Sequence, residues 1–479
     1  MRLLLSLLAL FGCGSKAAVD RSPGEPPPGV LATVELHGGA DLFRDLNAEL
    51  EGSFWEGLYE TPSALFSDIL SIPADVHPRP TSTITLAIFD NNRVAAVFKT
   101  APVEGRAGEG PRGSTLHAQS STVALDGTTA VAASTPELLA EVFPWLAYGL
   151  PSEEKPRGIY AEVSGDLLAR GGRRVASFVE DLSRDALINI RRERARHDEA
   201  PTLGEPEAVV RWGTARAEWL TEMTLDAEHA DVQIRPDPRG LRAEATLYFA
   251  ADSAFATWST TQAAVPVPPD LPERTAVVAW QAASTTPWLT ELVLGAGAGR
   301  IEDDIAESLR DARETRPLLA LGTQDQAWWA LFGGINANHQ EFGQQLLATS
   351  YAQTLVAHVL DCSAVDLPES LCGEARLWSY DDEGEYAYVI SSDATEVRRA
   401  GLRGVPQAAR VLPEEAAGLL FLDPPMIAAL PWVRDTGATN ERAPLCLSWS
   451  ADTQHSVTFR LAANRHGLAH LTQLVPAGR

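Results

Sequence analysis

The chain has 479 residues, of which 45% are hydrophobic and 22% charged, close to the averages of folded globular domains. At roughly 100 to 200 residues per domain, this length predicts about three domains and a sizeable core. The composition excludes wholesale disorder and a polytopic membrane protein. Because 64 acidic against 39 basic residues leave a net charge of -25, the chain would repel phosphate backbones, and nucleic acid is not expected as a partner.

The first thirteen residues have the layout of a secretory signal. Arg2 supplies a positive charge, residues 3–11 form an apolar run interrupted only by Ser6, and Gly12 and Cys13 follow. A bilayer core of about 30 Å needs about 20 apolar residues, so the run is too short for a permanent transmembrane helix. The pattern predicts a signal peptide over residues 1–12 and export of the rest.

The segment Leu10-Phe11-Gly12-Cys13 resembles the lipobox of bacterial lipoproteins. The resemblance covers only the N-terminus. It implies a diacylglyceryl group on the Cys13 thiol, cleavage before Cys13 and acylation of the new amino group, and such chains together give stable membrane anchoring. In lipoproteins of the enteric type, Gly14 rather than Asp after the cysteine favours the outer membrane, facing the periplasm or the surface. The alternative is an ordinary signal peptide with a coincidental cysteine.

Residues 14–29 are dense in Pro and Gly and show no apolar periodicity, which is typical of a semi-extended linker. With the lipidated Cys13 they predict a tether over residues 13–29 that holds the folded body away from the membrane. The membrane, reached through this lipid, is the one partner that the sequence indicates; a protein or small-molecule partner is unknown.

The body of the chain shows a recurring order of elements. Four segments pass from a Pro-rich turn into an apolar strand followed by helix, at residues 29–36, 158–163, 275–280 and 416–422. This recurrence predicts two to four related strand-helix-hairpin-helix modules, over residues 30–150, 151–268, 269–408 and, in a shorter form, 409–479. The alternative is that the likeness reflects an Ala- and Leu-rich composition.

Turn residues between alternating runs predict antiparallel hairpins. The expected hairpins span residues 83–98, 122–132, 232–249, 375–390 and 445–461. Apolar residues at helical spacing predict longer helices over residues 173–197, 206–225, 300–314 and 339–360. In addition, Ser134-Thr135-Pro136-Glu137 has the form of a capping box that opens a shorter helix. Such a mixture predicts the α+β class, with mainly antiparallel sheets and packed helices.

Three cysteines remain after Cys13. Cys362 and Cys372 flank a short loop with a Pro turn, and outside the cytoplasm two such thiols tend to oxidise, so a disulfide is expected; two free thiols are the alternative. Cys446 stands in a strand-like stretch and is interpreted as a small buried hydrophobe rather than a nucleophile.

Several patterns suggest chemistry, but each has a simpler structural explanation. His466 and His470 share the spacing of two zinc ligands, yet the Glu of a metalloprotease motif is missing and no third ligand can be nominated. Ser152 and Lys155 match a serine-lysine pair, but Pro156 would end the helix that must align them. The remaining patterns also have structural interpretations. Residues 295–300 are interpreted as a helix-to-helix turn, residues 381–383 as a hairpin tip and residues 302–304 as an acidic helix start. Residues 191–196 are interpreted as an exposed helix face, and the tryptophans as core packing.

The sequence therefore predicts an exported, lipid-anchored envelope protein with a non-enzymatic binding or scaffolding role and an unknown ligand. No catalytic residue, metal ligand or cofactor is nominated. The alternative is an extracytoplasmic hydrolase whose carboxylate or histidine site is dispersed along the chain and invisible in a single sequence.

Overall fold

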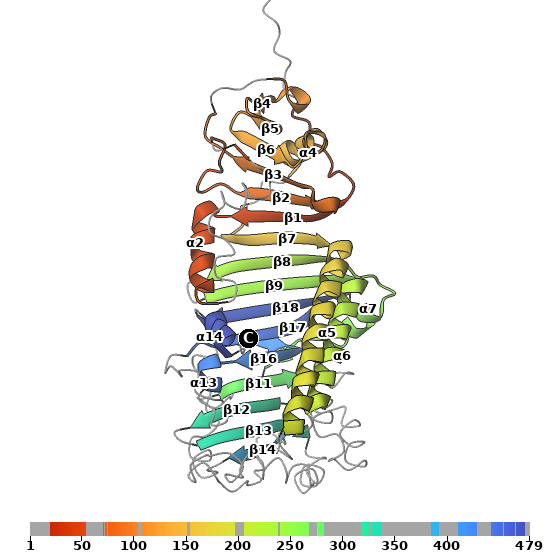
Figure 1. Ribbon diagram of the computed structural model, residues 1–479, viewed down its shortest axis with the longest axis vertical. Coiled ribbons are helices and arrows are strands. Elements are labelled where there is room, and N and C mark those ends of the chain that lie inside the picture. The colour runs from red at the N-terminus through yellow and green to blue at the C-terminus, as the bar shows by residue number, and fades with distance from the viewer. Residues whose placement is uncertain are drawn as a thin grey trace, which may run out of the picture. The chain divides into compact units, whose positions relative to one another are not determined.

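The computed structural model forms two compact units, which are described separately (Figure 1). Unit 1 consists of Met1–Asn47 and Leu58–Ala161, and unit 2 of Ala48–Gly57 and Glu162–Arg479. The residues that the structure describes are 20–53, 70, 72–73, 75–103, 108–150, 154–196, 206–237, 240–267, 275–281, 318–324, 327–336, 385–391, 411–428, 442–453, 455–464 and 466–474.

Unit 1 contains an antiparallel sheet in the order β1-β2-β3-β6-β5-β4. The strands are β1 (Val30–His37), β2 (Ile84–Phe89), β3 (Val94–Lys99), β4 (Thr115–His117), β5 (Ser120–Asp126) and β6 (Thr129–Ala133). Hairpins join β2 to β3 and β5 to β6, and Asn91 and Gly127 take the positive φ angles that these turns require. Short 3-10 turns, η1 (Asp90–Asn92) and η2 (Pro111–Gly113), lie between strands.

Helix α4 (Pro136–Tyr148) covers one face of the unit 1 sheet. The Thr135 hydroxyl accepts a hydrogen bond from the backbone N–H of Leu138 at 3.2 Å, which satisfies one of the unpaired donors in the first turn. The buried side chains of α4 pack with those of β2, β3, β5 and β6 into a core cluster that includes Phe89, Val131 and Phe143. Helix α2 (Gly39–Leu50) begins in this unit directly after β1.

Strand β7 (Gly158–Ser164) leads the chain into unit 2, whose sheet has the order β8-β9-β18-β17-β16-β11-β12-β13-β14. All neighbouring pairs in that order are antiparallel. The strands are β8 (Ala227–Asp237), β9 (Gly240–Phe249), β11 (Thr275–Gln281), β12 (Leu318–Gln324), β13 (Ala327–Asn336), β14 (Glu385–Ser391), β16 (Gly418–Leu422), β17 (Leu445–Thr453) and β18 (Ser456–Asn464). Smaller elements are α7 (Ala254–Ser259), β10 (Val265–Pro266), β15 (Glu415–Ala416), α13 (Pro424–Ala428) and α14 (Gly467–Leu474).

Two long helices form a hairpin that crosses the strands of unit 2 (Figure 1). They are α5 (Gly165–Arg196) and α6 (Pro206–Asp226). A Cβ on Gly172 would lie 1.9 Å from the Thr224 Oγ1, so the missing side chain lets the two helices approach closely. Met223 of α6 packs with Leu247, Phe255 and Val457 in a second core cluster.

The predicted α+β class with mainly antiparallel sheet is confirmed. The hairpins expected at residues 83–98, 122–132, 232–249 and 445–461 form as β2–β3, β5–β6, β8–β9 and β17–β18. Helix α5 begins at Gly165, eight residues before the predicted start at residue 173. Gly171 and Gly172 weaken the helical signal in the sequence, and the close packing of α6 compensates for their low helix propensity in the structure. Residues 300–314 and 339–360 lie outside the described residues, and the fourfold module stays a prediction.

Candidate functional site

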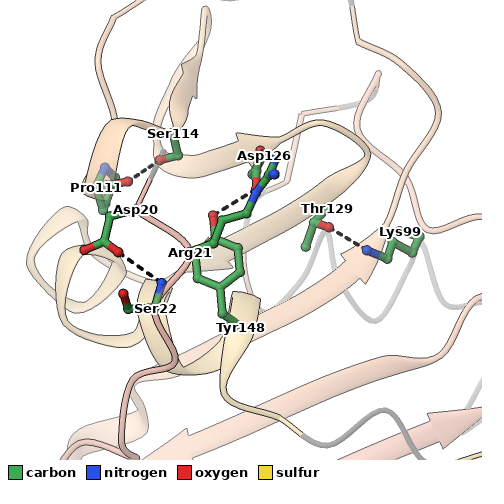
Figure 2. A network of polar contacts seen from close by, with 9 residues as sticks. All are labelled: Asp20, Arg21, Ser22, Lys99, Pro111, Ser114, Asp126, Thr129 and Tyr148. Carbon is green, nitrogen blue, oxygen red and sulfur yellow. Dashed lines mark hydrogen bonds and ion pairs between the residues drawn. The ribbon is translucent and has the colours of Figure 1, made fainter. Parts of the chain in front are cut away.

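The N-terminal segment of residues 20–29, which we call the strap, lies against unit 1 (Figure 2). The backbone N–H of Asp20 donates to the Arg112 carbonyl at 3.0 Å, and the N–H of Gly24 donates to the Pro144 carbonyl at 3.2 Å. The sequence predicted these residues as part of the tether; in the structure their backbone is bonded to the folded unit. Residues 13–19 lie outside the described residues.

Asp126, the last residue of β5, is the centre of the strap's side-chain contacts (Figure 2). Arg21 binds it through both carboxylate oxygens, with Nε at 3.0 Å and Nη2 at 3.1 Å, and the Tyr148 hydroxyl donates to the same carboxylate at 2.9 Å. The hydrogen bond from Arg21 lowers the pKa of Asp126. Burial, together with the hydrogen bond to Asp126, raises the pKa of Tyr148 to about 12. The carboxylate is therefore held ionised and the phenol protonated.

A second ion pair holds the start of the strap. Arg112 of η2 contacts the Asp20 carboxylate at 3.1 Å and the Ser22 carbonyl at 3.3 Å. The other Asp20 oxygen accepts from the Ser22 N–H at 3.0 Å, which closes a local turn, and hydrogen bonds from Ser22 lower the pKa of Asp20. Nearby, the Lys99 ammonium donates to the Thr129 hydroxyl at 2.6 Å, so it belongs to the neighbouring strand pair rather than to the strap (Figure 2).

Gly24 lets the strap lie directly on the last turn of α4. A Cβ at this position would stand 2.7 Å from the backbone nitrogen of Trp145 and 2.9 Å from the carbonyl carbon and the Cβ of Pro144. On the other side, a Cβ on Gly149 would stand 2.5 Å from the Gly24 carbonyl oxygen. Because such distances are too short for real carbon atoms, larger residues at either position would push the strap off the helix.

Glu35 of β1 is the centre of a second network in unit 1. Its Oε2 accepts from the Lys155 ammonium at 2.9 Å and lies 2.8 Å from the His37 Nε2. Burial raises the pKa of Glu35, but the hydrogen bonds from His37 and Lys155 outweigh it, so that the pKa lies below its usual value. Two residues after Lys155, Arg157 pairs with Asp41 and Asp45 of α2. These bonds tie the segment before β7 to β1 and α2.

His37 itself is buried, with a side chain that is 8% exposed. Because an ionised carboxylate can only accept, Nε2 donates in the bond to Glu35, and Nδ1 faces the hydroxyl of Thr83 at 3.4 Å. Tyr160 packs edge-on against the imidazole, with ring centroids 5.3 Å apart. Thr83 is exposed. Glu35, His37 and Thr83 therefore form a series in which a carboxylate, a base and an exposed hydroxyl follow one another.

His117 offers a comparison within the same unit. Its Nε2 lies 3.0 Å from Asp75, much as His37 meets Glu35, but its Nδ1 accepts the backbone N–H of Gln119 at 3.2 Å. The hydrogen bond from His117 lowers the pKa of Asp75. Because protein groups engage both ring nitrogens, His117 has no free lone pair to accept a proton from a bound molecule.

The residues nominated from the sequence do not converge in the described part of the chain. Cys13, Cys362 and Cys372 lie outside the described residues, so the lipid and the disulfide stay predictions. Cys446 is buried within β17, and burial raises its pKa to about 12, as expected of a small buried hydrophobe.

Two further motifs have a structural outcome. His466 precedes α14 and His470 lies within it, so the pair begins a helix instead of sharing one of its faces. Among the described residues, no group of three or more His, Cys, Asp and Glu side chains is arranged to hold a metal, and no helix has both the length and the hydrophobicity needed to cross a bilayer.

The sequence reasoning missed both networks of unit 1. For Glu35 and His37, the signal is the spacing of two polar residues at alternate positions of a strand, which places them on the same face. For Arg21 no local signal exists, because its partner lies 105 residues away. Comparisons with known protein families, curated proteins and solved structures find no match to this chain.

Proposed function

We propose that this chain is an exported protein anchored by a lipid on Cys13 to a bacterial outer membrane, with a non-enzymatic binding or scaffolding role. The observation that carries the anchor is the segment Leu10-Phe11-Gly12-Cys13 behind a short, positively charged apolar run. Attachment through acyl chains needs no membrane-spanning helix, since two or more chains are sufficient for stable anchoring.

The binding role is supported by apolar side chains that unit 2 leaves exposed. Leu420 and Leu447 pair directly across β16 and β17, and each is more than a third exposed. On α5, Val175 and Phe178 are 57% and 62% exposed, one helical turn apart. Where such groups form a contiguous patch, they mark surfaces that meet another molecule.

Replacing the anchoring cysteine tests the proposal. Cys13→Ser should move the protein from the membrane fraction to the released fraction of a bacterial host. Mass spectrometry of the unchanged protein should show acyl chains on Cys13, the first residue after cleavage. Ser15→Ala, two residues further on, is the matched control and should remain with the membrane. Membrane retention of Cys13→Ser at the level of the control would contradict the lipid anchor.

Hydrolysis is a second candidate function, favoured by the order Glu35–His37–Thr83. In this reaction the Thr83 oxygen attacks the carbonyl carbon of an ester, its proton passes to His37 Nδ1 and then to the departing alcohol, and water cleaves the resulting acyl-threonine with the same base. Glu35 would orient the ring and stabilise its protonated form.

Activity against a panel of acyl esters tests this candidate. His37→Gln and Thr83→Val should each abolish turnover by the purified full-length protein, whereas His117→Gln, the matched substitution at the histidine with both nitrogens engaged, should retain it. Equal loss in all three variants would point to unfolding of unit 1, and turnover unchanged by His37→Gln would exclude this site.

A further inference from the structure

We propose that the strap determines which part of unit 1 faces the membrane: the surface formed by the β5–β6 turn, η2 and the last turn of α4. The partner of this surface is the lipid bilayer in which the anchor is embedded. The inference rests on the lipid anchor proposed at Cys13, and it adds an orientation that the anchor by itself would leave open.

Three separate contacts hold the strap to this surface. Asp20 is bonded to Arg112 of η2, Arg21 to Asp126 at the end of β5, and Gly24 to Pro144 in α4. Figure 2 shows the contact between Arg21 and Asp126. The Tyr148 hydroxyl joins the last turn of α4 to the same Asp126 carboxylate. Because the contacts come from a turn, a strand end and a helix end, a single broken bond would not free the whole strap.

The docked strap shortens the length of chain that separates the lipid from the folded body. Seven residue steps separate Cys13 from Asp20, and a fully extended chain of that length spans at most about 25 Å. If residues 14–29 were all free, the seventeen steps from Cys13 to Val30 at the start of β1 would span up to about 60 Å. Docking therefore more than halves the reach and moves the attachment point from β1 to the surface around Asp126.

The composition of the strap helps to keep it in place. Pro23, Pro26, Pro27 and Pro28 restrict the backbone before and after Gly24, so the strap loses less conformational entropy on docking than a Gly- and Ser-rich segment would. Gly24 is the exception that the close approach to Trp145 requires. The segment thus combines a stiff chain with one small residue at its point of contact.

Energy transfer to labelled lipids tests the orientation. A fluorescent amino acid is placed at Thr128, in the β5–β6 turn beside the docked strap, or at Glu137, in the first turn of α4 and about 18 Å from its other end. The lipidated full-length protein is reconstituted into vesicles that carry an acceptor on the lipid headgroup. We expect at least twofold more transfer from position 128 than from position 137.

Release of the strap provides the matched variant. Combining Arg21→Ala with Gly24→Val removes the ion pair and places side-chain atoms against Trp145, so the two positions should then transfer equally. Equal transfer from both positions in the chain with an intact strap would overturn the orientation.

Flotation of the vesicles separates failure of the orientation from failure of the anchor. Protein that floats with the vesicles, and that ceases to float on Cys13→Ser, is anchored whatever the transfer shows. If the unchanged protein does not float, the anchor is wrong and the orientation falls with it. Hydrogen exchange of the Asp20 and Gly24 amides in Cys13→Ser then reports whether the strap still docks, and rapid exchange at both would overturn the docking as well.

Discussion

Asp126 and Glu35 each hold a cationic side chain from a distant segment, but the two cations differ in geometry and exposure. Arg21 binds Asp126 through two nitrogen atoms while its side chain remains 68% exposed, and Lys155 meets Glu35 through one nitrogen at 30% exposure. An exposed pair is weakened by solvent and salt, whereas a partly buried pair is screened less. From this difference we expect the strap to be held more weakly than the segment before β7.

The largest effect that this comparison predicts is from Glu35→Gln. The change leaves Lys155 without its carboxylate and converts a charged acceptor of the His37 proton into a neutral one, so we expect the free energy of unfolding of unit 1 to fall by about 1 to 2 kcal/mol. Hydrogen exchange of the β1 amides measures it. If exchange of the same amides showed that Asp126→Asn lowers the free energy of unfolding more than Glu35→Gln does, the ranking of the two networks would be reversed.

Asp126→Asn should have a smaller and more local effect. We expect about 1 kcal/mol or less in the stability of unit 1, because the carboxylate's main partner is an exposed arginine. Exchange of the Asp20 and Gly24 amides should nevertheless accelerate, since the strap loses the ion pair of Arg21 and keeps only that between Asp20 and Arg112. The control is Asp90→Asn, in the β2–β3 turn, which should leave both strap amides protected.

Both ends of the pH scale should weaken the contacts of the Asp126 carboxylate: low pH its ion pair with Arg21 of the strap, and high pH its hydrogen bond from Tyr148. The pKa of Asp126 is lowered in the folded protein, so its contribution is present above the usual value of 3.8 and is lost as the pH falls through the folded value. The pKa of Tyr148 is raised from 10.0 to about 12, so its contribution is present below pH 10 and is lost as the pH rises toward 12.

Difference absorbance between the unchanged protein and Tyr148→Phe isolates the ionisation of this one phenol. A midpoint near pH 10 would mean that Tyr148 does not donate to Asp126. With salt added, the strap amides should also exchange faster at neutral pH, whereas those of β1 should respond less.

Arg21→Lys should give the smallest change. Lysine keeps the charge but cannot bind both oxygens of Asp126, so the strap amides should exchange only a few-fold faster and the midpoint of thermal unfolding should stay the same. A substantial fall in that midpoint would show that the strap supports the fold of unit 1 rather than resting on it.

The sequence was sufficient where local chemistry decides the structure. Asp90-Asn91-Asn92 predicted the β2–β3 hairpin because two of these residues accept positive φ angles, and Thr135 predicted the start of α4. It could not show that β18 pairs with β9, in which Thr458 meets Thr246 across 212 residues, because strand periodicity carries no information about distant neighbours.

The candidate site was less accessible to sequence reasoning than the fold. The strap has the composition of a free linker, and its docking depends on a missing Cβ at Gly24 and on a carboxylate far along the chain. The sequence spacing relates Lys155 only to Ser152, whereas in the structure its ammonium donates to Glu35, 120 residues away. In both cases the decisive partner is brought close only by folding.

The order of strands in unit 2 has a consequence for synthesis. Strands β9 and β11 precede the segments that come to lie between them, since β16, β17 and β18 are supplied by residues 418–464. A nascent chain that ends before those residues has two open edges and cannot complete the sheet, and such edges attract other strands. If the chain is exported as proposed, this delay postpones completion of the sheet until almost the whole chain has crossed the membrane.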